Sequence, residues 1–149
     1  MSTLLELKEK AKSYDNKEMF GIECKFVIIS ISETRKQFVK CYKCNNYEMI
    51  TDPTKFVDKC PKCGVTNKDK PGCTFNITTY AIVDDGTFKA GLDLWNTDIT
   101  RFKVGDTVKI INGICKYKMT KDADGNLTVE NLFLQKQKGK QKGILELVK

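Results

Sequence analysis

Five segments of the chain carry the hydrophobic and polar pattern of β-strands. Each is rich in β-branched and aromatic residues, or alternates apolar with polar positions. These segments are 20–31, 74–83, 87–95, 107–118 and 127–135. Turns that contain glycine follow the second segment, at Asp84-Asp85-Gly86, and the fourth, at 122–126. Because glycine readily supplies the positive φ of tight turns, the pattern predicts two hairpins.

The segment 87–95 shows the alternation most clearly. Its apolar residues Phe88, Ala90, Leu92 and Leu94 alternate with Lys89, Gly91, Asp93 and Trp95. A period of two places the first set toward a core and the second set on the opposite face. Gly91 permits a sharp bend here, and Asn112-Gly113 predicts a bulge in the fourth strand.

Three shorter elements accompany these strands. Residues 4–14 place one set of apolar side chains roughly on one face of a short helix: Leu4, Leu5, Leu7, Ala11 and Tyr14. Residues 96–102 form at most two helical turns, capped by Asn96 or Thr97, and 144–148 are a last apolar element. Five strands with one helical link between the third and fourth have the order of a five-stranded barrel, so we expect an all-β fold.

The chain has 149 residues, the length of one ordinary domain. We expect a helical extension at 1–19, a barrel domain at 20–135 and a basic tail with a short apolar element at 136–149. Polar residues 32–36 lead from the first strand into a cysteine-containing insertion at 38–67. Its polar linker is typical of a small ribbon that uses a metal ion in place of a core.

Four of the seven cysteines form two CxxC pairs in this insertion, Cys41 with Cys44 and Cys60 with Cys63, separated by fifteen residues. Each pair aims two sulfurs at one point, and together they predict a tetrahedral Zn²⁺ site. Four thiolates leave no open coordination position, so we expect one structural zinc ion and no catalysis by it.

Iron is the rival metal, because the run from Cys60 to Gly64 also resembles a rubredoxin knuckle. The short separation of the pairs and the surrounding barrel favour zinc. The other cysteines, Cys24, Cys73 and Cys115, are expected to be small hydrophobes in strands. Cys73 stays open as an alternative ligand, since it lies close to the ribbon in sequence.

Charge and composition narrow the function. The 26 basic and 19 acidic residues give a net charge of +7, which favours a polyanionic partner such as nucleic acid, or else belongs to a solvated lysine-rich surface. No histidine is present, which excludes histidine-based acid–base chemistry and Ser-His or Cys-His triads. We expect a protein that is not an enzyme, has no small-molecule substrate and has no membrane partner.

The location follows from the same features. No apolar run reaches membrane-spanning length, and the first residues lack the regions of a signal peptide. An odd number of cysteines in tight knuckles argues for a reducing compartment. We expect an intracellular protein, cytoplasmic in an archaeal or viral setting and nuclear in a eukaryotic one.

Two stretches carry a resemblance to a known family. They are 89–96 (KAGLDLWN) and 102–113 (FKVGDTVKIING). They resemble the OB-fold of the replication protein A family, and most of all the zinc-ribbon-bearing domain of its large eukaryotic subunit and archaeal relatives. In that family an aromatic residue ends strand three, a phrase like K-x-G-D-x-V opens strand four, and the ribbon is inserted between strands one and two.

The resemblance covers about 20–135 and implies binding of single-stranded DNA in replication, repair or recombination, without catalysis. It also implies partner subunits like those of replication protein A. Two departures are visible. The second aromatic of the family, near the loop between strands four and five, has no counterpart where Leu127 stands. The chain has one such domain, whereas family members often have several.

An OB-fold binds single strands across its second and third strands, which selects the candidate contacts. Trp95 is the first candidate for stacking on a base, with a core position as its alternative. Lys89 shares its face and is a phosphate candidate or a solvated lysine. Tyr80 and Asn76 share a face of the second strand, where Tyr80 either stacks on a base or packs under the ribbon.

The fourth strand adds an aromatic residue between two basic ones, Lys116-Tyr117-Lys118. We expect Tyr117 to stack on a base and the two lysines to neutralise phosphates.

Three other functions fit the sequence. The same fold binds RNA in some proteins, and the 2′-hydroxyl would be the group that discriminates. The ribbon, the helix at 4–14 and the element at 144–148 could instead dock partner subunits. An enzyme accessory protein with a rubredoxin-like ribbon ranks last, because there the ribbon precedes the barrel and here a strand precedes the ribbon.

Overall fold

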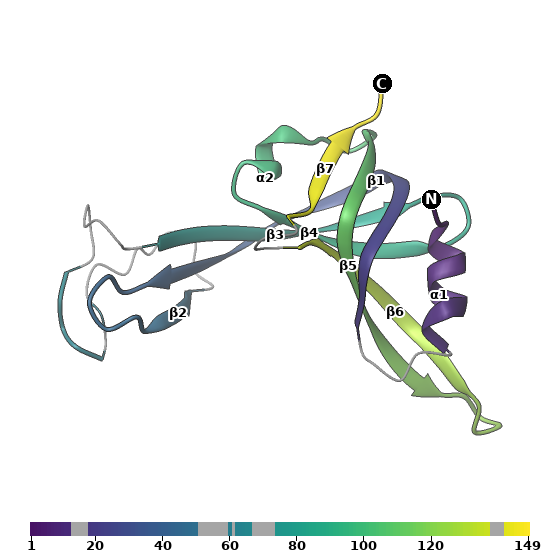
Figure 1. The fold of residues 1–149 in the computed structure, drawn as a ribbon, viewed down its shortest axis with the longest axis horizontal. Helices are drawn as coiled ribbons and strands as arrows, with labels where there is room; N and C mark the ends of the chain where they lie inside the picture. Colours follow the sequence, from purple (N-terminus) through teal and green to yellow (C-terminus); the bar gives the residue numbers. More distant parts are fainter. Residues whose placement is uncertain (13–17, 51–59, 61, 67–73, 138–141) are drawn as a thin grey trace.

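The structure, a computed structural model, describes residues 1–12, 18–50, 60, 62–66, 74–137 and 142–149, and it is mostly β. Its elements in chain order are α1 (Leu4–Lys12), β1 (Glu18–Lys40), β2 (Tyr47–Ile50), β3 (Thr74–Asp84), β4 (Lys89–Trp95), α2 (Asp98–Arg101), β5 (Thr107–Lys121), β6 (Leu127–Lys136) and β7 (Ile144–Leu147) (Figure 1). No helix within the described ranges is long and apolar enough to cross a membrane.

The strands pair in a closed ring. The sheet order is β2-β1-β3-β4-β6-β5-β7, and β1 also pairs with β5, which joins β1, β3, β4, β6 and β5 into a circuit. β4 and β6 run parallel, while the other described pairs are antiparallel. β7 continues the sheet beyond β5, so the apolar element at the end of the chain is a strand.

β1 closes the ring because it bends. Its first half pairs with β5 and its second half with β3, and its register shifts at four places along the strand. Such irregularities increase local bend and twist. One of them lies opposite Asn112, whose φ is 54°. The bulge predicted at Asn112-Gly113 is therefore confirmed.

The core is made by the inward faces predicted from the alternation. Ala90, Leu92 and Leu94 are at most 5% exposed, and α1 covers the core with Leu4, Leu7 and Ala11, whereas Leu5 points outward. Full burial of one such leucine contributes about 1.5–3 kcal/mol. Cys24 and Cys115 are fully buried among these side chains, as expected of small hydrophobes, and burial raises the pKa of each thiol to about 12. Tyr14 and Cys73 lie outside the described residues.

The strand β1 is longer than predicted. It continues through the polar residues 32–36 to Lys40, directly before the first CxxC pair. Pairing with β3 overrides the local polarity, since Gln37 lies opposite Ile77 and Lys40 opposite Thr74. As a result β1, β2 and β3 form an arm that projects from the ring (Figure 1). We use "arm" for residues 36–50, 60, 62–66 and 74–78.

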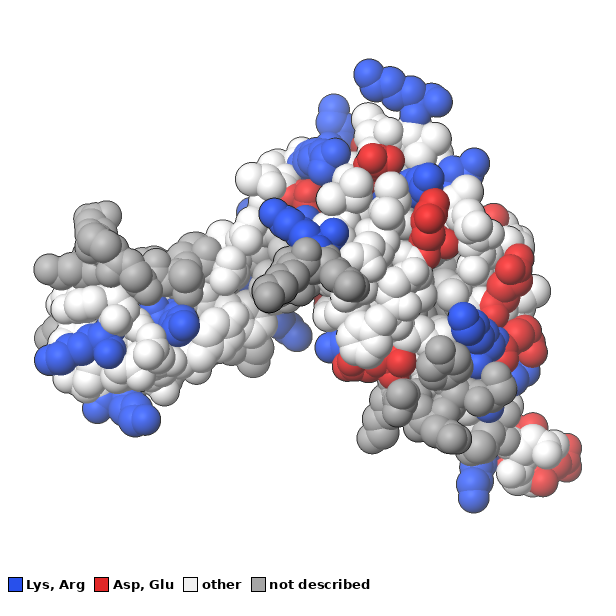
Figure 2. Space-filling view, in the orientation of Figure 1, with Lys and Arg blue, Asp and Glu red and all other residues white. Residues whose placement is uncertain are grey.

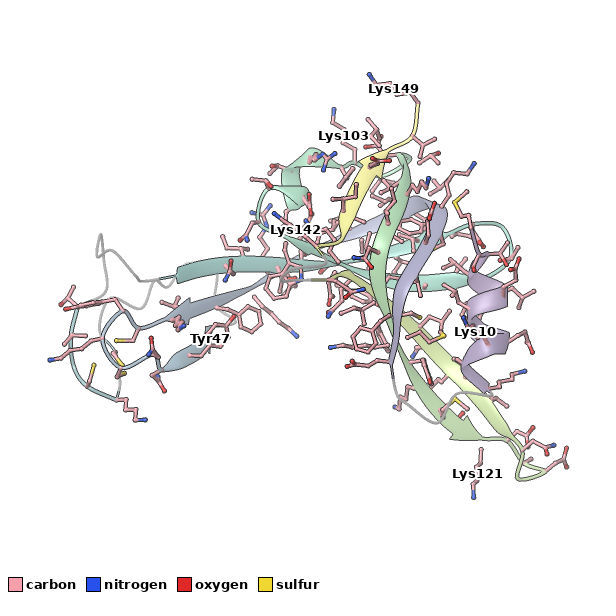
Figure 3. The ribbon with its side chains drawn as sticks, viewed as in Figure 1. Lys10, Tyr47, Lys103, Lys121, Lys142 and Lys149 are labelled. Carbon is pink, nitrogen blue, oxygen red and sulfur yellow. The ribbon has the colours of Figure 1, made fainter. Side chains whose placement is uncertain are left out.

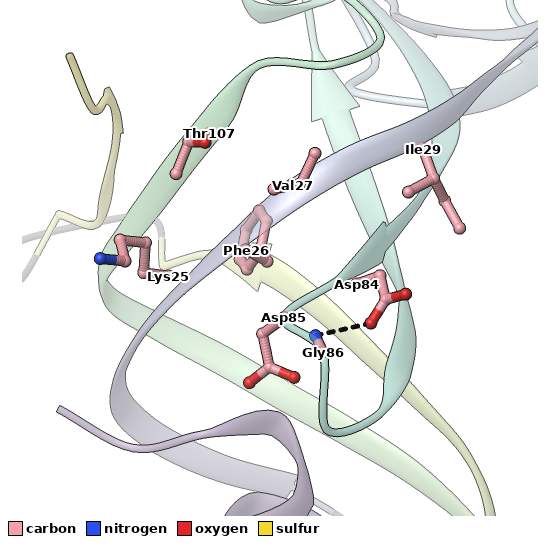
Figure 4. Close-up of a pocket in the computed structure, with 8 residues that line it drawn as sticks. All are labelled: Lys25, Phe26, Val27, Ile29, Asp84, Asp85, Gly86 and Thr107. Carbon is pink, nitrogen blue, oxygen red and sulfur yellow. Dashed lines mark hydrogen bonds between the residues drawn. The ribbon is translucent and has the colours of Figure 1, made fainter.

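The turn after β3 anchors α1. The Asp85 carboxylate accepts hydrogen bonds from the Leu4 N–H (2.7 Å), the Thr87 N–H (2.9 Å) and the Phe88 N–H (3.2 Å). Figure 4 shows Asp85 beside Gly86 at the edge of a pocket under β1. Burial raises the pKa of Asp85, but the bonds from Thr87, Leu4 and Phe88 outweigh it and leave the pKa lowered.

We expect Asp85→Ala to destabilise the fold by about 1–2 kcal/mol, because it removes both a helix-capping acceptor and a turn acceptor. A lowered folded-state pKa stabilises the fold above the unfolded pKa, and this contribution is lost as pH falls. Urea denaturation at neutral and acid pH measures the effect. The difference between Asp85→Ala and the parent should shrink in acid, and a constant difference would contradict the assignment.

Candidate metal centre and aromatic surface

The four cysteines predicted as ligands converge at the end of the arm. Their Sγ atoms all lie within 4.8 Å of one another. Cys41 Sγ lies 3.7 Å from Cys63 Sγ, and Cys44 Sγ lies 3.5 Å from Cys60 Sγ. A tetrahedron of sulfurs about 2.3 Å from a zinc ion has edges of roughly 3.8 Å. The cluster therefore has the size needed to hold a metal ion.

The two CxxC pairs repeat one backbone geometry. In each, the N–H of the first cysteine donates to the carbonyl five residues on, and the N–H four residues on donates back to the carbonyl of that cysteine. These bonds are Cys41 N to Asn46 O (2.9 Å), Asn45 N to Cys41 O (3.2 Å), Cys60 N to Val65 O (2.9 Å) and Gly64 N to Cys60 O (2.8 Å). The φ angles of Asn45 and Gly64 are 62° and 77°, and both residue types tolerate this region.

The same turns tune the thiols. The Cys44 N–H hydrogen-bonds the Cys41 sulfur and lowers the pKa of Cys41 to about 6, and the Cys63 N–H likewise lowers the pKa of Cys60. At Cys44 the Asn46 N–H lowers the pKa, but burial and the neighbouring thiols raise it to about 11. The cluster thus favours some thiolates but opposes four of them together unless a cation is bound.

A second feature joins the arm to the ring. Phe38 on β1 contacts Trp95 at the end of β4, with ring centroids 5.4 Å apart and planes at 36°. Phe38 also stacks on Tyr47 of β2, at 5.6 Å and 23°. We call Tyr47, Phe38 and Trp95 the aromatic row. Tyr47 is 51% exposed, and Figure 3 shows it on the arm, between the cysteines and the ring.

The structure places Trp95 as its strand parity predicts. It lies opposite Thr78, is half-buried and lies outside the core cluster. Sequence reasoning missed Phe38 and Tyr47. The available signal was the alternation Lys36-x-Phe38-x-Lys40, which becomes informative once β1 is extended to residue 40.

Tyr80 continues the aromatic surface on the neighbouring strands. Its ring lies 6.4 Å from that of Phe133 on β6, a residue that sequence reasoning also missed. A Cβ at Gly91 would overlap the Tyr80 ring, so glycine there makes room for the tyrosine. Tyr80 is 41% exposed and therefore accessible to a ligand.

The turn after β4 is fixed by asparagine. Asn96 has a φ of 53°, accepts a hydrogen bond from the Ile77 N–H (2.9 Å) and donates to the Asn76 side chain (3.0 Å). Asn76 therefore holds this turn beside Trp95. The N-cap of α2 is Thr97, one of the two residues predicted at that position, although its side chain makes no capping hydrogen bond.

Beside Trp95 lies a pocket of about 470 Å³ with basic residues on its wall. Lys136 forms an ion pair with the buried Asp98 at 2.5 Å, so the charge of this lysine is already neutralised. Lys142 is exposed and lies close to the turn that follows β4 (Figure 3).

The other predicted lysines lie on the surface. Lys89 is exposed, Lys116 pairs with Glu18 at 3.7 Å and Lys118 with Glu130 at 3.5 Å. Such exposed ion pairs are worth less than about 1 kcal/mol, so phosphates can compete for these lysines.

The arm itself is basic. Its residues in the described ranges include four lysines, Lys36, Lys40, Lys43 and Lys62, against one acidic residue, Glu48. Figure 2 shows basic side chains, in blue, along the arm.

The expectation for Tyr117 is wrong. Its side chain is 8% exposed and belongs to the hydrophobic core. The physical reason is the period of two, because Lys116 and Lys118 point outward on β5 and the residue between them must point inward. An aromatic that alternates with lysines along one strand lies on the opposite face from them.

Comparison with family models and with curated proteins gave no match. No family model matches the chain, and no curated protein matches it. The resemblance to replication protein A therefore stays a prediction from the sequence.

Proposed function

We propose that this chain binds single-stranded DNA along the outward face of β1, β3 and β4. The observation that carries the proposal is the aromatic row. Its three aromatic side chains are in contact on an accessible face that extends from the arm to the closed circuit of strands. Unpaired bases stack on such rings, at about 1–3 kcal/mol per base, whereas a duplex keeps its bases paired. A stacked surface with lysines around it suits a single strand.

The fold supports the same proposal. We assign the closed circuit of β1, β3, β4, β6 and β5 to an OB-fold barrel, in which β3 and β4 are the second and third strands. That fold binds oligonucleotides across these two strands, where Tyr80 and Trp95 lie. The short helix α2 then links the third and fourth strands, as the resemblance to replication protein A implies.

We assign the metal as a single structural zinc ion. The donor set is four sulfurs without a carboxylate or imidazole, which suits a closed tetrahedral site. Cys41, Cys44, Cys60 and Cys63 would hold it and fix the end of the arm. Metal analysis of the purified protein separates zinc from iron. A role in replication, repair or recombination, and subunits that assemble with the chain, follow only from the resemblance.

We expect a single strand to quench the fluorescence of Trp95, the one tryptophan of the chain, and a duplex of the same sequence to leave it nearly unchanged. Titrations with mixed-sequence 20-mers at several salt concentrations measure this. Log K should fall linearly with log salt, by about 0.7 for each phosphate contacted.

Comparison with the same sequence as RNA completes the test. Tighter binding of the ribo strand would favour RNA as the ligand, because the 2′-hydroxyl is the discriminating group. Failure to bind either single strand at low salt would refute the proposal, and so would a salt-independent affinity.

A further inference from the structure

A small pocket opens on the outward face where β1, β3 and β4 meet. It has a volume of about 270 Å³ and is lined by Ser32, Thr34, Lys36, Thr78, Thr79, Tyr80 and Asp93. A water molecule occupies about 30 Å³, so the pocket has room for a planar ring. The half-exposed Tyr80 ring forms one wall, and Asp93 lies directly opposite Tyr80 in the sheet.

The Asp93 carboxylate is the unusual group in this pocket. Within the described ranges no hydrogen bond or ion pair engages it, and its carboxylate oxygens are not sealed from solvent. Burial raises the pKa of Asp93, and the charges of Lys116 and Lys36 offset this only in part. A half-buried carboxylate is only partly hydrated, so on this basic surface it is available to accept a hydrogen bond from a ligand.

The hydroxyls of the two threonines on β3 do not supply that donor, because their protons are already used. The single proton of Thr79 Oγ1 is shared between the carbonyls of Ser32 and Thr34, both at 2.8 Å, and Thr78 Oγ1 donates to the Leu94 carbonyl at 3.1 Å. A phosphate is excluded too, since a carboxylate repels it. Among the groups that a single strand offers, the one that fits is a neutral N–H of a base.

We propose that Asp93 reads the base that lies against Tyr80, by accepting a hydrogen bond from its exocyclic amino group. Cytosine presents the N4 amino group where thymine presents the O4 acceptor, so the pocket selects cytosine over thymine. This inference rests on the proposed binding of single strands, and it adds a base preference to a surface that otherwise stacks on any base.

The test compares oligo-dC and oligo-dT of equal length, with the parent protein and with Asp93→Asn, by titration of Trp95 fluorescence. A hydrogen bond to a charged group is worth about 1.5–3 kcal/mol, so the parent should bind oligo-dC at least about tenfold more tightly. In Asp93→Asn the ratio should fall to about twofold or less, because an amide also donates to O4 of thymine.

Loss of one negative charge strengthens binding of all strands, so the ratio of the two affinities is the readout. Asp124→Asn is the matched control, since it removes the same charge from an exposed residue of the turn between β5 and β6 and should keep the parent ratio.

The outcomes separate the two proposals. If both oligonucleotides bind but the parent does not prefer oligo-dC, or if Asp93→Asn keeps the preference, the base-reading role is wrong and the proposed function stands. If neither oligonucleotide binds, both are wrong.

A second readout is independent of binding. Because the folded-state pKa of Asp93 is raised, the charged form weakens the fold as pH rises above the unfolded pKa. Asp93→Asn should therefore melt about 1–3 °C higher at neutral pH, with no gain for Asp124→Asn. A lower melting temperature for Asp93→Asn would show that the carboxylate serves the fold, and would overturn the proposal.

Discussion

Cys60→Ser releases the metal ion and unfolds the arm while the ring stays folded. The reason is where the stabilising contacts lie. The ring has its own hydrophobic core, whereas the described part of the arm buries few apolar side chains and depends on the four sulfurs. Structural zinc sites contribute on the order of 10–16 kcal/mol of binding free energy to the fold they hold, which no other contact in the arm replaces.

Three measurements check this result. Metal content should fall from one ion per chain to none, and hydrogen exchange should lose protection in β2 and in the arm halves of β1 and β3. Protection in β5 and β6 should persist. Treating the parent with a chelator should give the same exchange pattern.

Cys115→Ala is the matched control, because this cysteine is buried in the core and far from the cluster in sequence. It should keep the metal ion and lose some core stability. If Cys60→Ser retained a full equivalent of metal, or if arm and ring lost protection together, the arm would not be a separately stabilised unit.

Replacing Phe38 with alanine weakens binding of a single strand by about 1–3 kcal/mol, which is roughly 5- to 150-fold in Kd. The Phe38 ring lies between Tyr47 and Trp95, so its loss removes one stacking surface and the support of two others. Trp95→Ala should cause a loss of similar size. Fluorescence anisotropy of a labelled oligonucleotide measures both variants, since the second removes the intrinsic reporter.

The double variant tests whether the rings act together. Because Phe38 and Trp95 are in contact, the combined loss should be smaller than the sum of the two single losses. Phe20→Ala removes another exposed aromatic, 63% exposed, from the far end of β1 and should leave the affinity nearly unchanged. If the parent and Phe38→Ala bound the oligonucleotide with equal affinity, the aromatic row would not be part of the binding surface.

The local sequence pattern was sufficient to predict those features that depend on the strand period or on the spacing of metal ligands. The alternation along 87–95 predicted which side chains are buried, and the spacing of the cysteines predicted the cluster. Both depend on covalent geometry within a few residues, which a sequence states directly.

The local sequence pattern gave wrong predictions where pairing with another strand determines the structure. Residues 32–36 look like a loop by polarity, but the ladder with β3 makes them strand, and only that ladder brings Phe38 to Trp95. The pairing of β2 with β1 places Tyr47 in the same way. The prediction for Tyr117 was wrong for a different reason. Its basic neighbours were assumed to share its face, but the period of two in a strand places them on the opposite face.

One consequence follows from the position of the aromatic row. Tyr47 and Phe38 belong to the arm, while Trp95 belongs to β4 of the ring. A ligand that contacts all three side chains therefore bridges the arm and the ring of strands. The arm depends on the four sulfurs, whereas the ring is stabilised by its hydrophobic core. Thermodynamic reciprocity then requires that a bound strand raise the affinity for the metal ion by the same factor by which the ion raises the affinity for the strand. The bound strand and the metal ion would then each stabilise the binding of the other, although the strand contacts the aromatic row and the ion lies at the cysteine cluster.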